Sequence, residues 1–154
     1  MKTSPLAAML VLAMAVTAAA GGNTRTVAVV VEPDLVELAG GWRTRIAGVV
    51  APEPETPLHQ QALELSRSLL EGELVAIFTW TTDNTARGIV YGPDGLPFAK
   101  ILCGPDRATD IAEVLLERGL ARVDRDHLPP DCGHYRDIER RARERRIGIW
   151  AEAD

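Results

Sequence analysis

The pattern that most constrains the fold is a series of three short runs rich in β-branched residues, at 26–31, 34–38 and 42–50. Residues 32–33 separate the first two runs, and the glycine-containing residues 39–41 separate the last two. Short apolar runs bounded by glycine and proline are typical of antiparallel strands joined by tight turns. The pattern therefore predicts a three-stranded meander at the start of the folded region.

A helix is expected directly after this meander. Thr56 is a good helix-capping residue, Pro57 suits the first helical turn, and Gly72 ends the segment. Between these limits, apolar residues recur at helical spacing, namely at Leu58, Ala62, Leu65 and Leu69. The sequence thus predicts one amphipathic helix following the third strand.

Strand signals resume beyond Gly72. Residues 73–81 are expected to form a strand, and residues 89–91 are expected to pair with 96–102 across a turn at 92–95. The last two expected elements are helices, at residues 106–118 and 131–146. The fold class predicted from this order is α+β and mainly a β barrel: an OB-fold, which is a five-stranded Greek-key barrel, with about three flanking helices.

The first twenty residues have a different character from the rest. Lys2 precedes an apolar run at residues 6–16, and small residues follow at 18–20. This order is typical of a secretory signal peptide, and the run is short for a membrane span. We therefore expect residues 1–20 to be a signal peptide and 21–154 to be one domain. The mature protein is expected to be a periplasmic or secreted monomer without stable membrane insertion.

Composition and charge exclude some classes of protein. The 154 residues are 46% hydrophobic and 25% charged, which excludes a disordered or collagen-like chain. The formal net charge of −5 argues against loose attraction of the whole surface to nucleic acid or anionic lipid, although a local arginine cluster can still bind phosphate. The arginine-rich helix at 131–146 is best explained as a solvated face with i,i+4 pairs, and a phosphate-binding stripe is the alternative.

Cys103 and Cys132 are the only two cysteines. An even number of cysteines behind an export signal favours one disulfide. Closing a loop of this size would stabilise the fold by about 3 to 4 kcal/mol. A zinc site with His127 and His134 is an alternative, but its spacing matches no compact zinc pattern. Free thiols are the third option.

Three polar stretches at expected strand ends contain the residue types that phosphodiester hydrolysis requires. They cover residues 32–34, 45–53 and 83–88. Cations hold the phosphate oxygens, a base orients the attacking water, and a metal neutralises the charge that develops on the phosphoryl group. Arginine, glutamate and aspartate in these stretches are therefore candidate site residues.

The ordered set of these motifs resembles the staphylococcal nuclease, or thermonuclease, family over about residues 26 to 150. The set consists of Glu32-Pro33-Asp34, Arg45 followed by Glu53, Arg87-Gly88, the segment 119–123, and the terminal 148–150. The resemblance implies an OB-fold barrel with flanking helices and hydrolysis of DNA and RNA that uses calcium.

The resemblance also implies a role for each matching residue. Arg45 and Arg87 would contact the scissile phosphate and stabilise its pentacovalent transition state, while Glu53 would orient or deprotonate the attacking water. Asp34 would bind Ca²⁺ through its carboxylate, and Ala51 would bind it through its main-chain carbonyl.

The metal side of this site departs from the family pattern. Val50 stands where the family has a second calcium-binding aspartate, and Ala51 stands where it has threonine. Pro33 and Leu35 replace the glycine and threonine that usually flank the first aspartate. Because calcium affinity follows the number of charged oxygen ligands, we expect metal binding to be weakened.

Two main functions follow from the sequence. The first is an exported phosphodiesterase of the thermonuclease type. The alternative is a catalytically inactive OB-fold module that binds single-stranded DNA or RNA, or a cell-envelope partner. A structural envelope protein is a third reading, because Arg45 could simply pair with a surface carboxylate and Asp34 could be a turn residue. Asp83 and Glu55 stay outside the predicted site.

Overall fold

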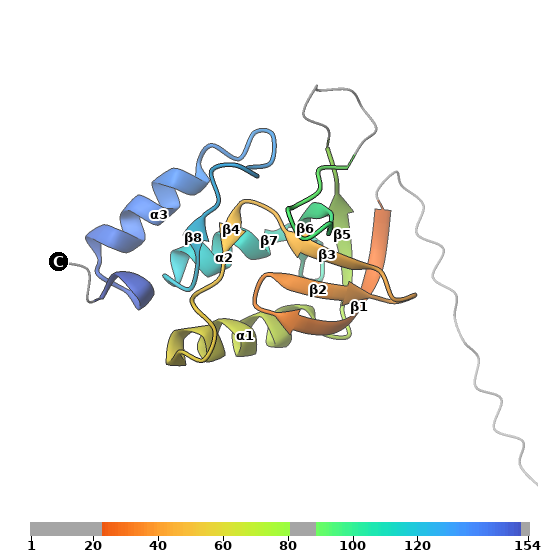
Figure 1. Cartoon of the computed structure of the whole chain (residues 1–154), viewed down its shortest axis with the longest axis horizontal. Coiled ribbons are helices and arrows are strands. Elements are labelled where there is room, and N and C mark those ends of the chain that lie inside the picture. The colour runs from red at the N-terminus through yellow and green to blue at the C-terminus, as the bar shows by residue number, and fades with distance from the viewer. Residues whose placement is uncertain (1–22, 81–88, 152–154) are drawn as a thin grey trace, which may run out of the picture.

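The computed structural model of the protein describes residues 23–80 and 89–151 (Figure 1). The predicted signal peptide at residues 1–20, Asp83 and Arg87 lie outside the described residues. Within residues 23–80 and 89–151, every helix is too short or too polar to span a lipid bilayer.

Five strands close into a barrel, as the sequence predicted. They are β1 (Asn23–Glu32), β2 (Leu35–Leu38), β3 (Arg43–Ile46), β5 (Leu74–Phe78) and β6 (Phe98–Cys103). Their order is β3-β2-β1-β5-β6, and β3 also pairs with β6 to close the barrel. The β3–β6 pair is parallel, and the other barrel pairs are antiparallel. This mixed barrel with helices around it confirms the OB-fold class.

The predicted first helix is α1 (Pro57–Leu70), which packs against the barrel strand β1. The Thr56 side chain caps it by accepting a hydrogen bond from the His59 N–H at 3.1 Å. The buried Ser66 hydroxyl donates to the Pro33 carbonyl at 2.8 Å, which attaches the helix to the turn between β1 and β2. The helix therefore holds in place the turn that carries Asp34.

The third predicted strand, at residues 42–50, is interrupted. It divides into β3 and β4 (Val49–Val50), and β4 leaves the barrel to pair with β8 (Arg122–Val123). The break occurs at Gly48, which has a φ of +78°. A Cβ at this position would lie 2.7 Å from Cε2 of the buried Tyr135 ring, so the close approach of backbone and ring requires glycine.

The remaining elements are β7 (Thr109–Asp110), α2 (Ile111–Glu117), α3 (Tyr135–Glu144) and the 3₁₀ helix η1 (Gly148–Trp150). The predicted helix starts at 106 and 131 were wrong. Asp110 caps α2 by accepting from the Ala112 N–H at 3.0 Å, so that helix cannot begin earlier. Asp131 has a φ of +61°, which excludes it from a helix.

Both cysteines are buried free thiols, and the predicted disulfide between Cys103 and Cys132 is not formed in the structure. The Cys132 sulfur instead accepts a hydrogen bond from Lys100 Nζ at 3.4 Å. The predicted disulfide is therefore not confirmed by the structure. The zinc alternative has no support in the described chain, where no group of three or more His, Cys, Asp and Glu side chains is placed to hold a metal.

Replacing Gly48 with alanine should destabilise the protein strongly. The substitution combines a left-handed backbone with the Tyr135 clash, and we expect a loss of roughly 2 to 4 kcal/mol in the free energy of unfolding. Gly72→Ala is the matched control, because Gly72 has a similar φ of +81° but open space around it. Urea unfolding of both variants measures the difference, and equal losses would show that the Tyr135 contact is unimportant.

Candidate functional site

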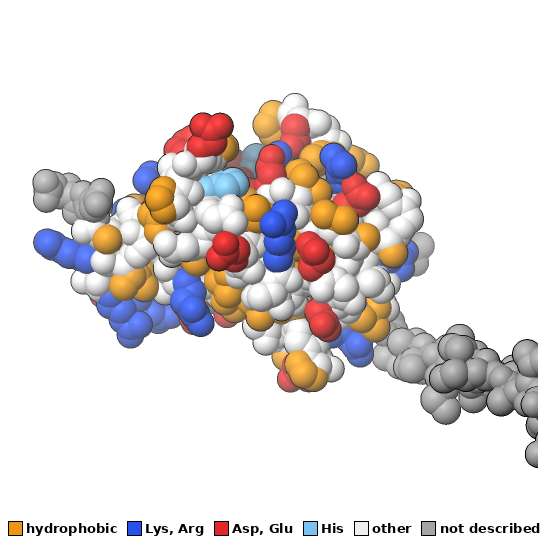
Figure 2. Space-filling model, turned by 90° about the horizontal axis from the view of Figure 1, so that it is seen from below, with side chains coloured by type: hydrophobic (Ala, Val, Ile, Leu, Met, Phe, Trp, Pro, Cys, Tyr) orange, Lys and Arg blue, Asp and Glu red, His pale blue; other side chains and the backbone are white. Residues whose placement is uncertain are grey.

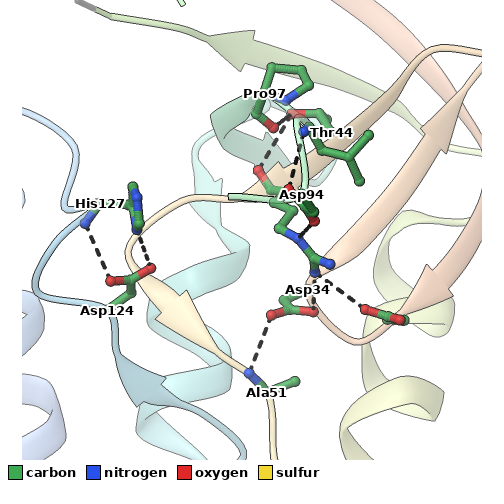
Figure 3. Close-up of polar contacts among 10 residues, drawn as sticks. Asp34, Thr44, Ala51, Asp94, Pro97, Asp124 and His127 are labelled. Atoms are coloured by element: carbon green, nitrogen blue, oxygen red, sulfur yellow. Dashed lines mark hydrogen bonds and ion pairs between the residues drawn. The ribbon is translucent and has the colours of Figure 1, made fainter. Parts of the chain in front are cut away.

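The candidate site is a hollow of about 220 Å³ at one end of the barrel. The β1–β2 turn, strand β3 and the segment after β4 converge there, and Figure 3 shows their side chains. The lining residues are Glu32, Asp34, Arg45, His59 and residues 50–54. Four predicted site residues, Asp34, Arg45, Ala51 and Glu53, therefore line one cavity. Their chemical roles stay predictions, and Arg87 lies outside the described residues.

Arg45 is at the centre of the site because of its position in the sheet. It pairs with Leu35 of β2 on one side and with Phe98 of β6 on the other. Its backbone N–H donates to the Pro97 carbonyl at 2.8 Å. The side chain is 24% exposed, so the guanidinium can meet a ligand from solvent while its backbone is held on both sides.

Three carboxylates surround the Arg45 guanidinium. Nε donates to Asp94 Oδ2 at 2.5 Å, and Nη1 lies 3.3 Å from Glu32 Oε2 and 3.5 Å from Asp34 Oδ1. The hydrogen bond from Arg45 lowers the pKa of Asp94. The positive charge of Arg45, which would attract a phosphate, is therefore already balanced by acidic side chains of the protein.

Asp34 is the most enclosed carboxylate of this set. Its Oδ2 accepts a hydrogen bond from the Ala51 N–H at 3.3 Å, and its Oδ1 faces Arg45. Burial raises the pKa of Asp34, although the Ala51 hydrogen bond and the charge of Arg45 act in the opposite direction. Both carboxylate oxygens are therefore engaged by protein groups.

Glu53 lies on the solvent side of the hollow and is exposed. Its backbone is fixed, because its carbonyl accepts from the Thr56 hydroxyl at 2.7 Å. The preceding Pro52 carbonyl lies 2.9 Å from His59 Nδ1. Within the described part of the chain, the Glu53 carboxylate has no ion pair. A held backbone with an unpaired carboxylate suits a group that accepts a proton from water.

Sequence reasoning missed the role of Asp94. It was identified only as a turn residue, whereas the structure brings it against Arg45 and next to Thr44 and Pro97 (Figure 3). The contact depends on the parallel pairing of β3 with β6, which no local pattern reveals. The strand predicted at 89–91 is not formed, and only a single β-bridge joins Tyr91 to Pro97. The segment that lies beside Arg45 is 94–98.

A second polar pair lies near this end of the barrel. His127 Nδ1 is 2.8 Å from Asp124 Oδ2, and the His127 ring stacks on Phe98 with ring centroids 4.3 Å apart (Figure 3). His134 in turn lies 2.6 Å from Glu113. Each of these two histidines is thus paired with a carboxylate, in contrast to the zinc site considered from the sequence.

Comparisons with known proteins point to one family. The family model described as "Staphylococcal nuclease homologue" matches residues 43–152. The chain is also 25% identical over 126 residues to "Staphylococcal-like nuclease CAN1" of Arabidopsis thaliana. The aligned residues cover 76% of this chain and 32% of that protein. The chain therefore spans about a third of the length of that relative.

The Arg45–Asp94 pair should make a pH-dependent contribution to stability. Because the pKa of Asp94 is lowered in the folded protein, its ionised form stabilises the fold above the usual aspartate range, and this stabilisation is lost as pH falls through the lowered pKa. We expect Asp94→Asn to cost about 0.5 to 1 kcal/mol at pH 7 and almost nothing at about pH 2. Urea unfolding at both pH values measures this.

Asp126→Asn is the control for this measurement. Asp126 is exposed, and it has no ion pair among the residues that the structure describes. Its replacement should leave the difference between the two pH values unchanged. A loss in Asp94→Asn that persists undiminished at low pH would contradict the ion-pair assignment.

Proposed function

Because the chain belongs to the staphylococcal nuclease family, we propose that it is an exported phosphodiesterase that hydrolyses DNA or RNA with water as the nucleophile. The observation that carries the proposal is the convergence of Arg45 and Glu53, a cation and a carboxylate without an ion pair among the described residues, on one solvent-open hollow. Export is proposed from the charged, apolar and small-residue pattern of residues 1–20.

Arg45 is the phosphate-binding group of the proposed mechanism. Its planar guanidinium offers paired N–H donors that match two phosphate oxygens, and this contact strengthens as negative charge develops in the transition state. Asp94 and Glu32 occupy those donors in the free protein. Binding of two phosphate oxygens through Nε and Nη2 therefore requires that a phosphate oxygen replace Asp94 on Nε.

Glu53 is the proposed base. Its backbone is held at the start of α1, and its side chain lines the same hollow as Arg45. A carboxylate in this position orients a water molecule and takes its proton as the oxygen attacks phosphorus. The P–O bond to the leaving oxygen then breaks, and the leaving group takes a proton from solvent.

The staphylococcal nuclease family is generally calcium-dependent, so the oxygen atoms that could coordinate a cation matter for the proposed activity. The two candidates are the Asp34 carboxylate and the Ala51 carbonyl, and both Asp34 oxygens already contact protein groups. Val50, at the position of the missing aspartate, is 47% exposed at the rim of the hollow. Calcium prefers six to eight oxygens, so these residues do not fit a dedicated calcium site.

The second candidate function is a binding module that does not cut its ligand. Val50 in place of a charged ligand favours it, as does the pairing of Arg45 with three carboxylates. The same barrel would then hold single-stranded nucleic acid or a cell-envelope partner without turnover.

Hydrolysis of a fluorogenic single-stranded DNA by the mature protein tests the proposal. Glu53→Gln removes the base and should lower the rate about 10²- to 10⁴-fold. Arg45→Lys keeps the charge but loses the paired donors, and we expect a loss of about 10²-fold. Glu55→Gln is the control, because Glu55 is an exposed neighbouring acid outside the hollow and its replacement should leave the rate unchanged.

The same assay is titrated with calcium and with chelator. We expect a weak dependence that needs high calcium, because few protein oxygens are free to bind the metal. Folded wild-type protein that binds the DNA but does not cut it at any calcium concentration would reject the enzyme and favour the binding module.

A further inference from the structure

Arginine side chains gather where the end of α2 faces α3, although the chain as a whole has a formal net charge of −5. Figure 2 shows several Lys and Arg side chains at this end, whereas acidic and basic side chains alternate over the rest of the visible face. A hollow of about 470 Å³ lies between the two helices. Arg118, Arg141 and Arg145 line it together with a single acid, Glu117, and its apolar lining residues are Ile138, Ala142 and Ile147. An arginine rim around an apolar floor suits a ligand with both phosphate and apolar parts.

A second hollow adjoins the Arg45 hollow and contains a further arginine, Arg122. Its volume is about 340 Å³, and Arg122 and Ile149 are among its lining residues. Residues 50–53 line both this hollow and the Arg45 hollow. Arg122 is moreover the direct cross-strand partner of Val50 in the β4–β8 pair. A chain that leaves Arg45 across residues 50–53 therefore meets Arg122 next.

Trp150 holds Arg122 in place without neutralising it. The Arg122 guanidinium lies 5.1 Å from the centroid of the Trp150 ring, and the Arg143 guanidinium lies 4.1 Å from it. Trp150 is only 7% exposed, so its ring is a fixed platform. A cation–π contact orders the arginine side chain while its outward N–H groups stay available to an anion.

The charges at this end are available, in contrast to the charge of Arg45. Within the described residues, no ion pair is formed by any of Arg118, Arg122, Arg141 and Arg145. Arg140 on α3 is, by contrast, paired with carboxylates: it lies 3.0 Å from Asp137 and 3.3 Å from Glu144. Unpaired arginines attract polyanions more strongly than paired ones, because no protein carboxylate competes for their donors.

We propose that Arg118, Arg122, Arg141 and Arg145, here called the arginine track, bind the phosphates of a single-stranded nucleic acid on one side of the phosphate held by Arg45. The apolar residues between the arginines contact sugar and base faces. The inference rests on the proposed function for its ligand class. The arginine track supplies most of the binding affinity for the strand. Arg45, with its carboxylate partners, contacts the reacting phosphate.

Binding of a fluorescein-labelled 20-nucleotide single strand, measured by anisotropy in chelator over a range of salt, tests the track without hydrolysis. The variant is Arg122→Gln/Arg141→Gln/Arg145→Gln in the full mature chain. Each lost phosphate contact lowers the salt slope by about 0.7, so the slope should fall by about 2 and binding at low salt by about 30-fold or more. Binding of a labelled dinucleotide should be unchanged.

The matched control is Arg43→Gln/Arg67→Gln/Arg140→Gln, which removes the same net charge from arginines that are paired with carboxylates. It should keep the wild-type salt slope. Circular dichroism and thermal unfolding establish that both triple variants are folded. Equal weakening in the two triple variants would overturn the track and leave only a general effect of charge.

Two further outcomes separate this inference from the proposed function. Hydrolysis that depends on Glu53, with strand binding unaffected in the track variant, would overturn the track and leave the proposed enzyme standing. Strand binding that depends on the track, with no hydrolysis at any calcium concentration, would support the track and reject the enzyme.

Polyglutamate that competes as well as an oligonucleotide of equal charge would overturn nucleic acid as the ligand.

Discussion

The parallel contact between β3 and β6 is the interaction on which the barrel and the site both depend. The Arg45 N–H donates to the Pro97 carbonyl and the Ala47 N–H donates to the Ala99 carbonyl, at 2.8 and 2.9 Å. These bonds join strands that are far apart in the sequence and close the sheet upon itself. The same contact brings Asp94 against the Arg45 side chain. Barrel closure therefore also determines the electrostatic environment of the candidate phosphate-binding group.

The interruption of the third strand at Gly48 has a second consequence for the site. If residues 42–50 continued as one strand, residues 50–53 would stay with the barrel. Instead, the chain turns beside Tyr135, and β4 pairs with β8. The segment that carries Glu53 thereby becomes the boundary between the Arg45 hollow and the hollow that contains Arg122. The backbone turn at Gly48 therefore places the Arg45 hollow next to the hollow that contains Arg122.

The two groups of arginines differ in how they are held. Arg45 is ordered by carboxylates that compete with a phosphate for its donors. Arg122 is ordered by the Trp150 ring, which does not compete. A polyanion therefore gains more from the helical end, where no carboxylate has to be displaced, than from the barrel site. This difference fits a division between a surface that retains the strand and a site that acts on one phosphate.

Local sequence patterns were sufficient to predict most of the individual helices and strands. Thr56 and Pro57 set the start of α1, and residues 32–33 and 39–41 between the β-branched runs set the turns of the meander. These features depend on capping, turn geometry and periodicity, which act over a few residues. For the same reason, the order of the motifs was enough to indicate the family.

The contacts between residues distant in the sequence emerge only in the folded chain. The contact of Asp94 with Arg45 arises from parallel pairing between distant strands, and the break at Gly48 arises from the approach of Tyr135, nearly ninety residues later in the sequence. The cross-strand neighbours Val50 and Arg122 come together in the same way. Local patterns carry no information about such contacts, because their energy depends on the register and closure of the whole barrel.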